Sequence, residues 1–133
     1  MDQGTRWKQR YQQFSNAFKL LELSLQITQP SVVERAGIIQ FFEMAFELSW
    51  KLLKDYQEAE GFQINSPRNA IKQAFQSELV TDGHQWIQAL EDRNLTTHTY
   101  NEVTAQLVEQ KIRGDYFALL AELHLTFAKK LTP

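Results

Sequence analysis

Cysteine is absent from this 133-residue chain, which excludes disulfide scaffolds, zinc ribbons and thiol nucleophiles. Glycine and proline number only five and three, too few for an all-β sandwich, which needs a turn about every 10 residues. No apolar run approaches the ~18 residues of a membrane span, and no apolar leader follows Met1, so we expect a cytoplasmic protein without a membrane segment. The formal net charge of −2 gives no bulk attraction to nucleic acid, so such a contact would need a local patch.

Hydrophobic residues, by contrast, make up 43% of the chain and include nine Phe, four Tyr and three Trp. This content is enough to close a sizeable core, and it excludes intrinsic disorder. The length is that of one domain, and no repeat, low-complexity tract or linker divides it. We therefore predict a single domain over residues 1–133.

Apolar residues recur with the period of an α-helix from the beginning of the chain. Steps of three and four form one seam as far as Thr28, and its members are Trp7, Tyr11, Phe14, Phe18, Leu21 and Leu25. Pro30 ends this helix. Ser31 with Glu34 has the pattern of a capping box that starts a second helix, which Gly61 ends.

The second helix carries apolar residues on two sides. One stripe comprises Val32, Ala36, Ile39, Phe42, Phe46, Trp50 and Leu53, and the other comprises Ile38, Phe41, Ala45, Leu48, Leu52 and Tyr56. A helix that is apolar on two sides must be covered on two sides. Because a small bundle covers one side itself, we expect a homodimer. The alternative is a central helix wrapped entirely within one chain.

Start signals divide the rest of the chain into shorter helices. Ser66 before Pro67 opens a helix through about Ser77, and Thr81 or Asp82 caps the next one. The predicted inner faces of these two helices are Ile71, Ala74 and Phe75, then Trp86, Ala89 and Leu90.

A third capping box, Thr99 with Glu102, predicts a further helix whose first residue is Tyr100. Its predicted inward residues are Val103, Leu107 and Val108, and the Gly114–Asp115 pair indicates a break before the last helix. The chain is therefore predicted to be all-α, an antiparallel up-and-down helical bundle of four to five main helices.

Most candidates for chemistry have a structural explanation. No pair of His or Glu residues has the spacing of a helical metal site, and no glycine-rich phosphate loop is present, so we expect neither a metal nor another cofactor. Glu43 and Glu47 lie one turn apart between the two apolar stripes. Paired carboxylates can carry acid–base chemistry, but they can equally serve structure or an interface.

The segment from Asp92 to Tyr100 differs from the rest because Arg93 and His98 stand five residues apart in it. On a continuous helix the two would point ~140° apart, but the predicted helix start at Thr99 implies a bend after Leu95. A bend lets an arginine, an imidazole and a helix N-terminus converge, and such a group suits a phosphate. The positive surroundings would leave His98 able to act as a base near neutral pH.

This segment resembles the Arg-x4-6-His motif of the HEPN superfamily, and Arg93, His98 and Tyr100 match the longer form Arg-x4-His-x-Tyr of HEPN proteins that accompany minimal nucleotidyltransferases. Asn94 fits the polar residue that usually follows the arginine. Further matches, similar to those of the nucleotidyltransferase substrate-binding protein family, are Phe42-Glu43, the run Phe46 to Lys51, Gly61 and Ser66-Pro67-Arg68.

The resemblance implies a helical dimer in which two motifs face each other across a cleft, and a minimal nucleotidyltransferase as partner. It implies a toxin that cleaves RNA without metal through Arg93 and His98, with Asn94 orienting the arginine or the phosphate. The partner would neutralise it, in some systems by transferring AMP to the tyrosine, here Tyr100. Supporting roles would fall to Glu43, Glu47 and Arg68. The alternative is a non-catalytic subunit that binds a nucleotide or substrate for the nucleotidyltransferase.

Overall fold

The computed structural model describes residues 2–93 and 101–132, apart from the side chain of Gln3, and this part of the chain is helical, with no strand. The helices are α1 (Gln3–Ser24), α2 (Val32–Ala59), α3 (Pro67–Gln76), α4 (Gly83–Asp92), α5 (Glu102–Lys111) and α6 (Phe117–Leu131). A π-helical turn, η1 (Ile112–Tyr116), joins α5 to α6. None of the described helices is long and apolar enough to cross a membrane. The all-α prediction is confirmed.

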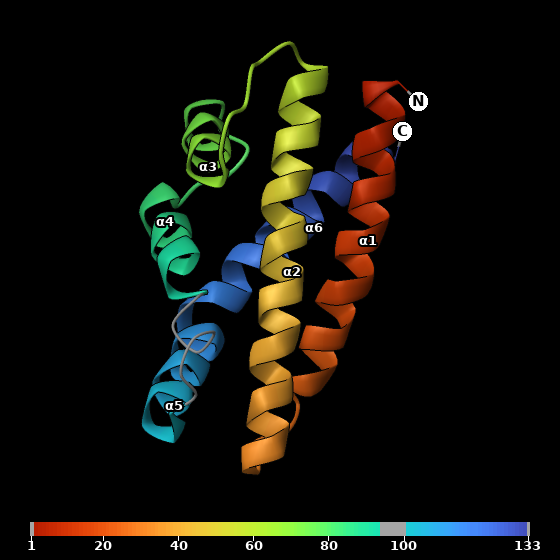
Figure 1. The fold of residues 1–133 in the computed structure, drawn as a ribbon. Coiled ribbons are helices and arrows are strands. Elements are labelled where there is room, and N and C mark those ends of the chain that lie inside the picture. Colours follow the sequence, from red (N-terminus) through yellow and green to blue (C-terminus); the bar gives the residue numbers. More distant parts are fainter. Residues whose placement is uncertain (1, 94–100, 133) are drawn as a thin grey trace.

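The long helix α2 is the centre of the molecule. It forms an antiparallel hairpin with α1 and contacts α3, α5 and α6 (Figure 1). The short helices α3, α4 and α5 follow one another down one side of α2, and α6 returns behind it towards the beginning of α1 (Figure 1). This return brings the ring of Phe127 on α6 to within 5.6 Å of the ring of Trp7 on α1, measured between centroids.

The predicted signals at both ends of α2 are confirmed. Ser31 Oγ accepts the Glu34 N–H at 3.1 Å, and the Glu34 carboxylate accepts the Ser31 N–H at 2.9 Å, which completes the capping box. Gly61 follows the last turn with φ of +100°, a conformation that costs a side-chain-bearing residue energy but not glycine. The two ends of α2 are therefore set by local sequence.

The burial of α2 favours the alternative in which one chain covers both stripes. Most members of the two stripes are buried inside the monomer, against α1 on one side and α3, α5 and α6 on the others. Val32 and Ala36, near the start of α2, stay exposed. Farther along α2, a narrow line stays at the surface, in which Phe41 and Leu48 are partly buried and Met44 is exposed. A homodimer is therefore not required by α2 alone and stays a prediction.

The predicted buried face of α3 is partly wrong. Phe75 on α3 is half exposed, because the buried face of this helix is set by Ala70, Ile71 and Ala74. The Phe75 ring packs instead on Gly83, where an added Cβ would lie 2.9 Å from its Cγ.

The start of α5 also differs from the prediction. Asn101 is its N-cap, accepting the Thr104 N–H at 3.1 Å, so α5 begins at Glu102 and not at residue 100. Ala105 and Val108 face the core, whereas Val103 and Leu107, which were predicted to point inward, are exposed. The predicted break at Gly114–Asp115 is confirmed as the π turn η1.

Candidate functional site

Arg93 is the described residue of the predicted motif, and it lies at the C-cap of α4. Helix α4 is anchored by the buried side chains of Trp86, Ala89 and Leu90, as predicted. From this fixed end, the Arg93 guanidinium reaches α2, where its Nη1 lies 2.8 Å from Oε2 of Glu47. The Arg93 side chain is 23% exposed and that of Glu47 is 42% exposed. The pair therefore joins two helices at a position that solvent reaches.

Glu47 is shared by two cations. Its other oxygen, Oε1, lies 3.8 Å from Nζ of Lys51, one turn along α2. Glu43 lies one turn before Glu47 on α2 and is partly buried. The structure thus brings Glu47, one of the two predicted supporting carboxylates, into contact with Arg93. The residues are 46 positions apart in the sequence, which is why local patterns did not predict the pairing.

Arg68, the third predicted supporting residue, occupies a different place. Its Nη2 lies 3.2 Å from Oε1 of Glu91, and both side chains are about half exposed. This ion pair connects α3 to α4 two residues before Arg93. Arg68 therefore acts in the structure as a link between these helices.

Three motif residues, Asn94, His98 and Tyr100, lie outside the described residues, as does the predicted bend after Leu95. The flanking helices are described: α4 ends at Asp92, and α5 begins at Glu102. Glu102 and Glu109 of α5 both form ion pairs with Arg35 of α2, the second at 2.7 Å. The two ends of the motif segment are therefore each fixed to α2, at Glu47 and at Arg35.

Asp92, next to Arg93, points to another side of α4 and meets the π turn. Its Oδ1 accepts the Gln88 side-chain N–H at 3.2 Å, and its Oδ2 accepts the hydroxyl of Tyr116. Burial, together with the hydrogen bond to Asp92 and the charges of Asp115 and Glu91, raises the pKa of Tyr116 well above its usual value. Tyr116 was not among the predicted site residues, and the predicted break at Gly114–Asp115 beside it was the available signal.

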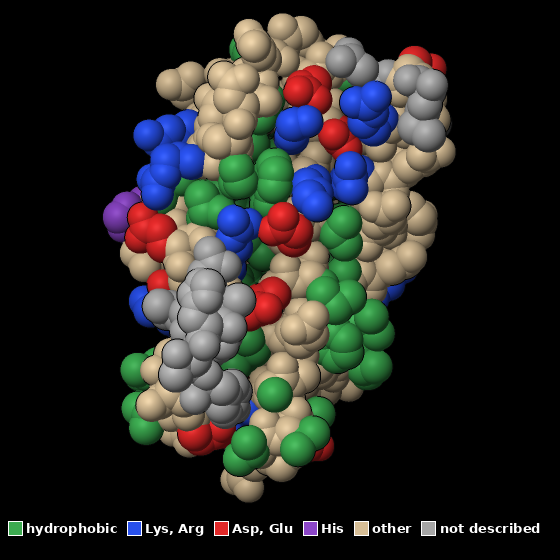
Figure 2. Space-filling model, viewed as in Figure 1, with side chains coloured by type: hydrophobic (Ala, Val, Ile, Leu, Met, Phe, Trp, Pro, Cys, Tyr) green, Lys and Arg blue, Asp and Glu red, His purple; other side chains and the backbone are tan. Residues whose placement is uncertain are grey.

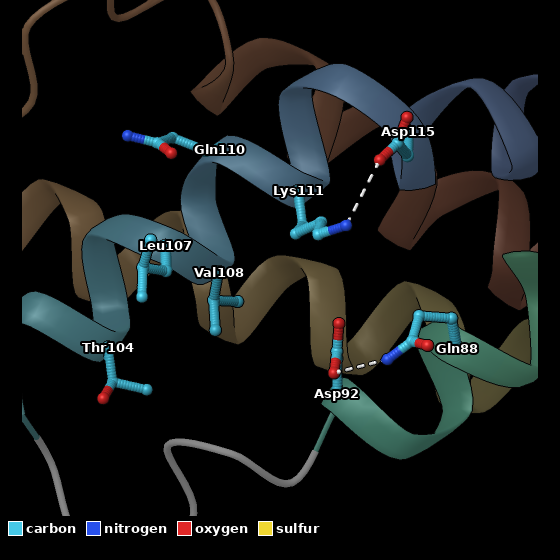
Figure 3. A pocket seen from close by; sticks show the side chains of 8 residues that line it. All are labelled: Gln88, Asp92, Thr104, Leu107, Val108, Gln110, Lys111 and Asp115. Carbon is cyan, nitrogen blue, oxygen red and sulfur yellow. Dashed lines mark hydrogen bonds and ion pairs between the residues drawn. The ribbon is translucent and has the colours of Figure 1, made fainter.

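A cavity of about 480 Å³ opens between α4, α5 and η1 (Figure 3). Its lining residues are Gln88, Asp92, Thr104, Leu107, Val108, Gln110, Lys111 and Asp115. Lys111 and Asp115 face each other across one turn, with 3.8 Å between Nζ and Oδ2 (Figure 3). The cavity thus combines two carboxylates, one ammonium, two amides and an apolar wall, directly beside the helix end that carries Arg93.

His124, by contrast, has a packing role. Its Nε2 lies 2.9 Å from Oγ of Ser15, and its ring stacks on Phe18 with 4.7 Å between centroids. Burial, with the nearby charge of Lys19, lowers the pKa of His124. Within residues 2–93 and 101–132, no group of three or more His, Asp or Glu side chains could hold a metal ion.

Charged side chains are mixed over this face of the molecule. Figure 2 shows Lys and Arg side chains over the upper parts of α1, α2 and α3, with carboxylates between them. Ion pairs of opposite sign also occur within and between these helices, where Arg10 of α1 contacts Asp55 of α2 and Lys54 contacts Glu58 along α2. Hydrophobic side chains gather along the neighbouring parts of α1 and α2 lower in the same view (Figure 2).

Comparison with known proteins identifies a family and several relatives of this chain. The family model described as nucleotidyltransferase substrate binding protein like matches residues 9–129. A Haemophilus influenzae protein named probable ribonuclease HepT is 30% identical over 92 residues, which are 63% of each chain. The present chain thus matches less than two thirds of that relative's length.

Two solved structures share the fold. A Thermus thermophilus protein is 32% identical with a TM-score of 0.78, covering 90% of this chain and 99% of its own. A Haemophilus influenzae protein, described as revealing the fold of a substrate binding domain of a nucleotidyltransferase, is 28% identical with a TM-score of 0.73 and coverages of 86% and 96%. With nearly the whole sequence matched by the family model, the chain belongs to the nucleotidyltransferase substrate binding protein like family.

Proposed function

We propose that this chain is the HEPN subunit of a two-component system with a minimal nucleotidyltransferase, and that it is a metal-independent endoribonuclease. The observation that carries the proposal is the placement of Arg93, whose guanidinium is held by Glu47 at the solvent-accessible end of α4, directly before the segment that contains His98. The name of the HepT relative, a probable ribonuclease, supports the same activity.

In this proposal the chemistry is an internal transfer at phosphorus. One His98 takes the proton from a ribose 2′-hydroxyl, and the 2′-oxygen attacks the adjacent phosphorus atom. The bond from phosphorus to the 5′-oxygen breaks, and a second His98 protonates that oxygen. Arg93 stabilises the negative charge that builds on the phosphoryl oxygens, and Asn94 orients the arginine or the phosphate.

Two copies of His98 require two chains, and the surface of α2 supports a homodimer. The exposed Met44 and the partly buried Phe41 and Leu48 share one side of α2, and Glu47 follows Met44 by three residues on the same helix. A second copy packed on this apolar line would bring its own Arg93 towards the first one. The geometry of α2 is thus compatible with a site shared across a two-fold axis.

The partner would silence the nuclease in this system. The hydroxyl of Tyr100 attacks the α-phosphorus of ATP on the nucleotidyltransferase, pyrophosphate leaves, and the hydroxyl proton is released. The attached AMP would add negative charge and bulk to the motif, which would disfavour binding of an RNA phosphate. This chain would then be the toxin, and the nucleotidyltransferase would be the antitoxin that inactivates it by AMP transfer.

The second candidate function is a non-catalytic subunit that binds a nucleotide or substrate for the nucleotidyltransferase. The description of the family and that of the second Haemophilus influenzae structure favour it. Arg93 would then hold a phosphate without any bond being broken.

The deciding experiment is incubation of the purified protein with RNA in EDTA, alone and with the nucleotidyltransferase and ATP. Cleavage without metal that Arg93→Ala and His98→Ala abolish, while circular dichroism shows intact folding, supports the nuclease. Replacement of the exposed Arg6 by alanine removes the same charge elsewhere and should leave cleavage unchanged. A partner whose activity depends on this chain, without any cleavage, supports the binding subunit and overturns the nuclease.

A further inference from the structure

The cavity between α4, α5 and η1 (Figure 3) takes no part in the proposed cleavage mechanism. Its size, about 480 Å³, lies within the range of small-molecule sites. Asp92 points into it while the next residue, Arg93, points to α2. Because the two residues are adjacent in the chain, the cavity opens next to the helix end that carries Arg93.

The charge of the cavity determines which chemical group of a ligand can bind inside it. The carboxylates of Asp92 and Asp115 outnumber the single ammonium of Lys111, so a phosphate inside the cavity would be repelled. The described lining residues instead offer carboxylate acceptors, amide groups and the apolar side chains of Leu107 and Val108. This lining suits a flat, neutral group with hydrogen-bond donors on one edge.

Asp92 has acceptor capacity to spare. Among residues 2–93 and 101–132, each of its oxygens accepts one hydrogen bond, from Gln88 and from Tyr116. Two carboxylate oxygens provide about four acceptor positions, so about two stay available for a ligand. Those two hydrogen bonds also fix the plane of the carboxylate, because one comes from α4 itself and the other from the buried Tyr116.

Among the four RNA bases, guanine matches this arrangement. Its N1–H and exocyclic amino group are neighbouring donors that a single carboxylate can accept together, and its O6 can accept from Lys111. Adenine and cytosine present one amino group beside an acceptor, and uracil presents one N–H between two acceptors. Neither arrangement gives a carboxylate two donors on one edge.

We propose that this cavity is a guanine-binding subsite, in which Asp92 accepts from the donor edge of the base, Lys111 donates to O6, and Leu107 packs against the ring. The subsite would make the chain select RNA with a guanosine next to the phosphate held at Arg93. The inference rests on the proposed function, because RNA is the ligand there, but the base selectivity belongs to residues that the proposed mechanism does not use.

The test uses a short oligoribonucleotide with one guanosine next to the cleaved bond, and a matched oligomer with inosine at that position. Inosine lacks the exocyclic amino group and keeps N1–H and O6. The wild-type protein should cleave the guanosine oligomer about tenfold faster, as expected for one lost hydrogen bond to a charged group. Asp92→Asn should remove this difference, because the amide presents a donor to the donor edge.

Glu91→Gln is the matched control, because Glu91 is the neighbouring carboxylate and pairs with Arg68 outside the cavity; it should keep the tenfold difference. If Asp92→Asn fails to fold, Lys111→Ala provides the second variant, since Lys111 is about half exposed. It should lower the preference for guanosine over adenosine at least threefold, with Lys129→Ala on α6 as its control.

Binding of the same oligomers, measured by fluorescence anisotropy, separates the two proposals. Preferential binding of guanosine that Asp92→Asn removes, without cleavage by the wild type, would overturn the nuclease but keep the subsite. Equal cleavage rates for the guanosine and inosine oligomers would overturn the subsite, and so would a guanosine preference that persists in Asp92→Asn. Cavity variants that change only the binding of the nucleotidyltransferase would also overturn it. Absence of both binding and cleavage would overturn both.

Discussion

At the scale of single residues, the site depends on a contact that the sequence could not supply. Arg93 and Glu47 were each predicted as candidates, but from separate patterns: a motif near the end of α4 and a carboxylate pair on α2. Their contact depends on how α4 packs against α2, which in turn depends on Trp86 and other buried side chains. Local spacing can identify functional residue types, whereas tertiary packing decides which of them meet.

Glu47 should act as a positioning residue for Arg93. Glu47→Ala would release the guanidinium from its place on α2, and we expect the rate of RNA cleavage to fall about tenfold with little change in folding. Glu47→Gln, which keeps one acceptor, should restore part of the rate. Glu58→Ala, which breaks the comparable pair with Lys54 on the same helix, serves as the control; an equal loss in that variant would contradict a specific role for Glu47.

His124 should make stability depend on pH. Because its pKa is lower in the folded chain than the ordinary value of 6.5, the unfolded chain binds a proton at a higher pH than the folded chain does. Stability from this residue is therefore complete above about pH 6.5 and is lost as the pH falls towards the folded-state pKa.

The measurement is the melting temperature of wild type and His124→Gln between pH 5 and 8. We expect the decrease on acidification to be smaller in the variant. His84→Gln, which changes an exposed histidine, is the control variant. Parallel slopes for wild type and His124→Gln would show that another group is responsible.

At the scale of helices and turns, the positions of the helix ends were predicted more accurately than the buried faces of the short helices. The capping box at Ser31, the glycine at 61 and the caps at Ser66 and Asp82 lie where the sequence indicated. The start of α5 was missed because Asn101 competes with Thr99 as a cap, and both are good N-cap residues. Val103 and Leu107 are exposed because the buried face of α5 is set by Ala105 and Val108.

Gly61 should be the most sensitive glycine of the helix ends. Its φ of +100° strains any residue with a Cβ, although an added Cβ would meet nothing within 4 Å. Gly61→Ala should lower the free energy of unfolding by about 1–2 kcal/mol in urea denaturation. Gly61→Asn should cost less, because asparagine tolerates a positive φ better than alanine does. Equal losses in the two variants would contradict conformational strain as the cause.

At the scale of the whole molecule, the sequence predicted the all-α class and the family, and the remaining question is assembly. The two apolar stripes of α2 predicted a second subunit, but α1, α3, α5 and α6 of the same chain cover most of both. Composition and periodicity report how much surface must be covered; they do not report which chain covers it. The line through Phe41 and Met44 is the part of α2 that a partner could still cover.

Met44→Glu should therefore separate the subunits. A carboxylate in the proposed interface would be buried without a partner, so we expect the dimer dissociation constant to rise about 100-fold or more in analytical ultracentrifugation. Leu125→Glu makes the same kind of change on α6, where the leucine is exposed, and should leave the assembly unchanged. A wild-type protein that sediments as a monomer would contradict the two-chain site.

The π turn at Ile112–Tyr116 has a consequence for how related chains can differ. A turn of this kind holds more residues than an α-helical turn, so it offsets the angular positions of everything after it from those before it. A homologue with one residue fewer at this point could still run as one continuous rod from α5 to α6. It would then present a different side chain where Tyr116 meets Asp92, and alignment gaps at this single position would mark which members of the family retain that hydroxyl–carboxylate contact.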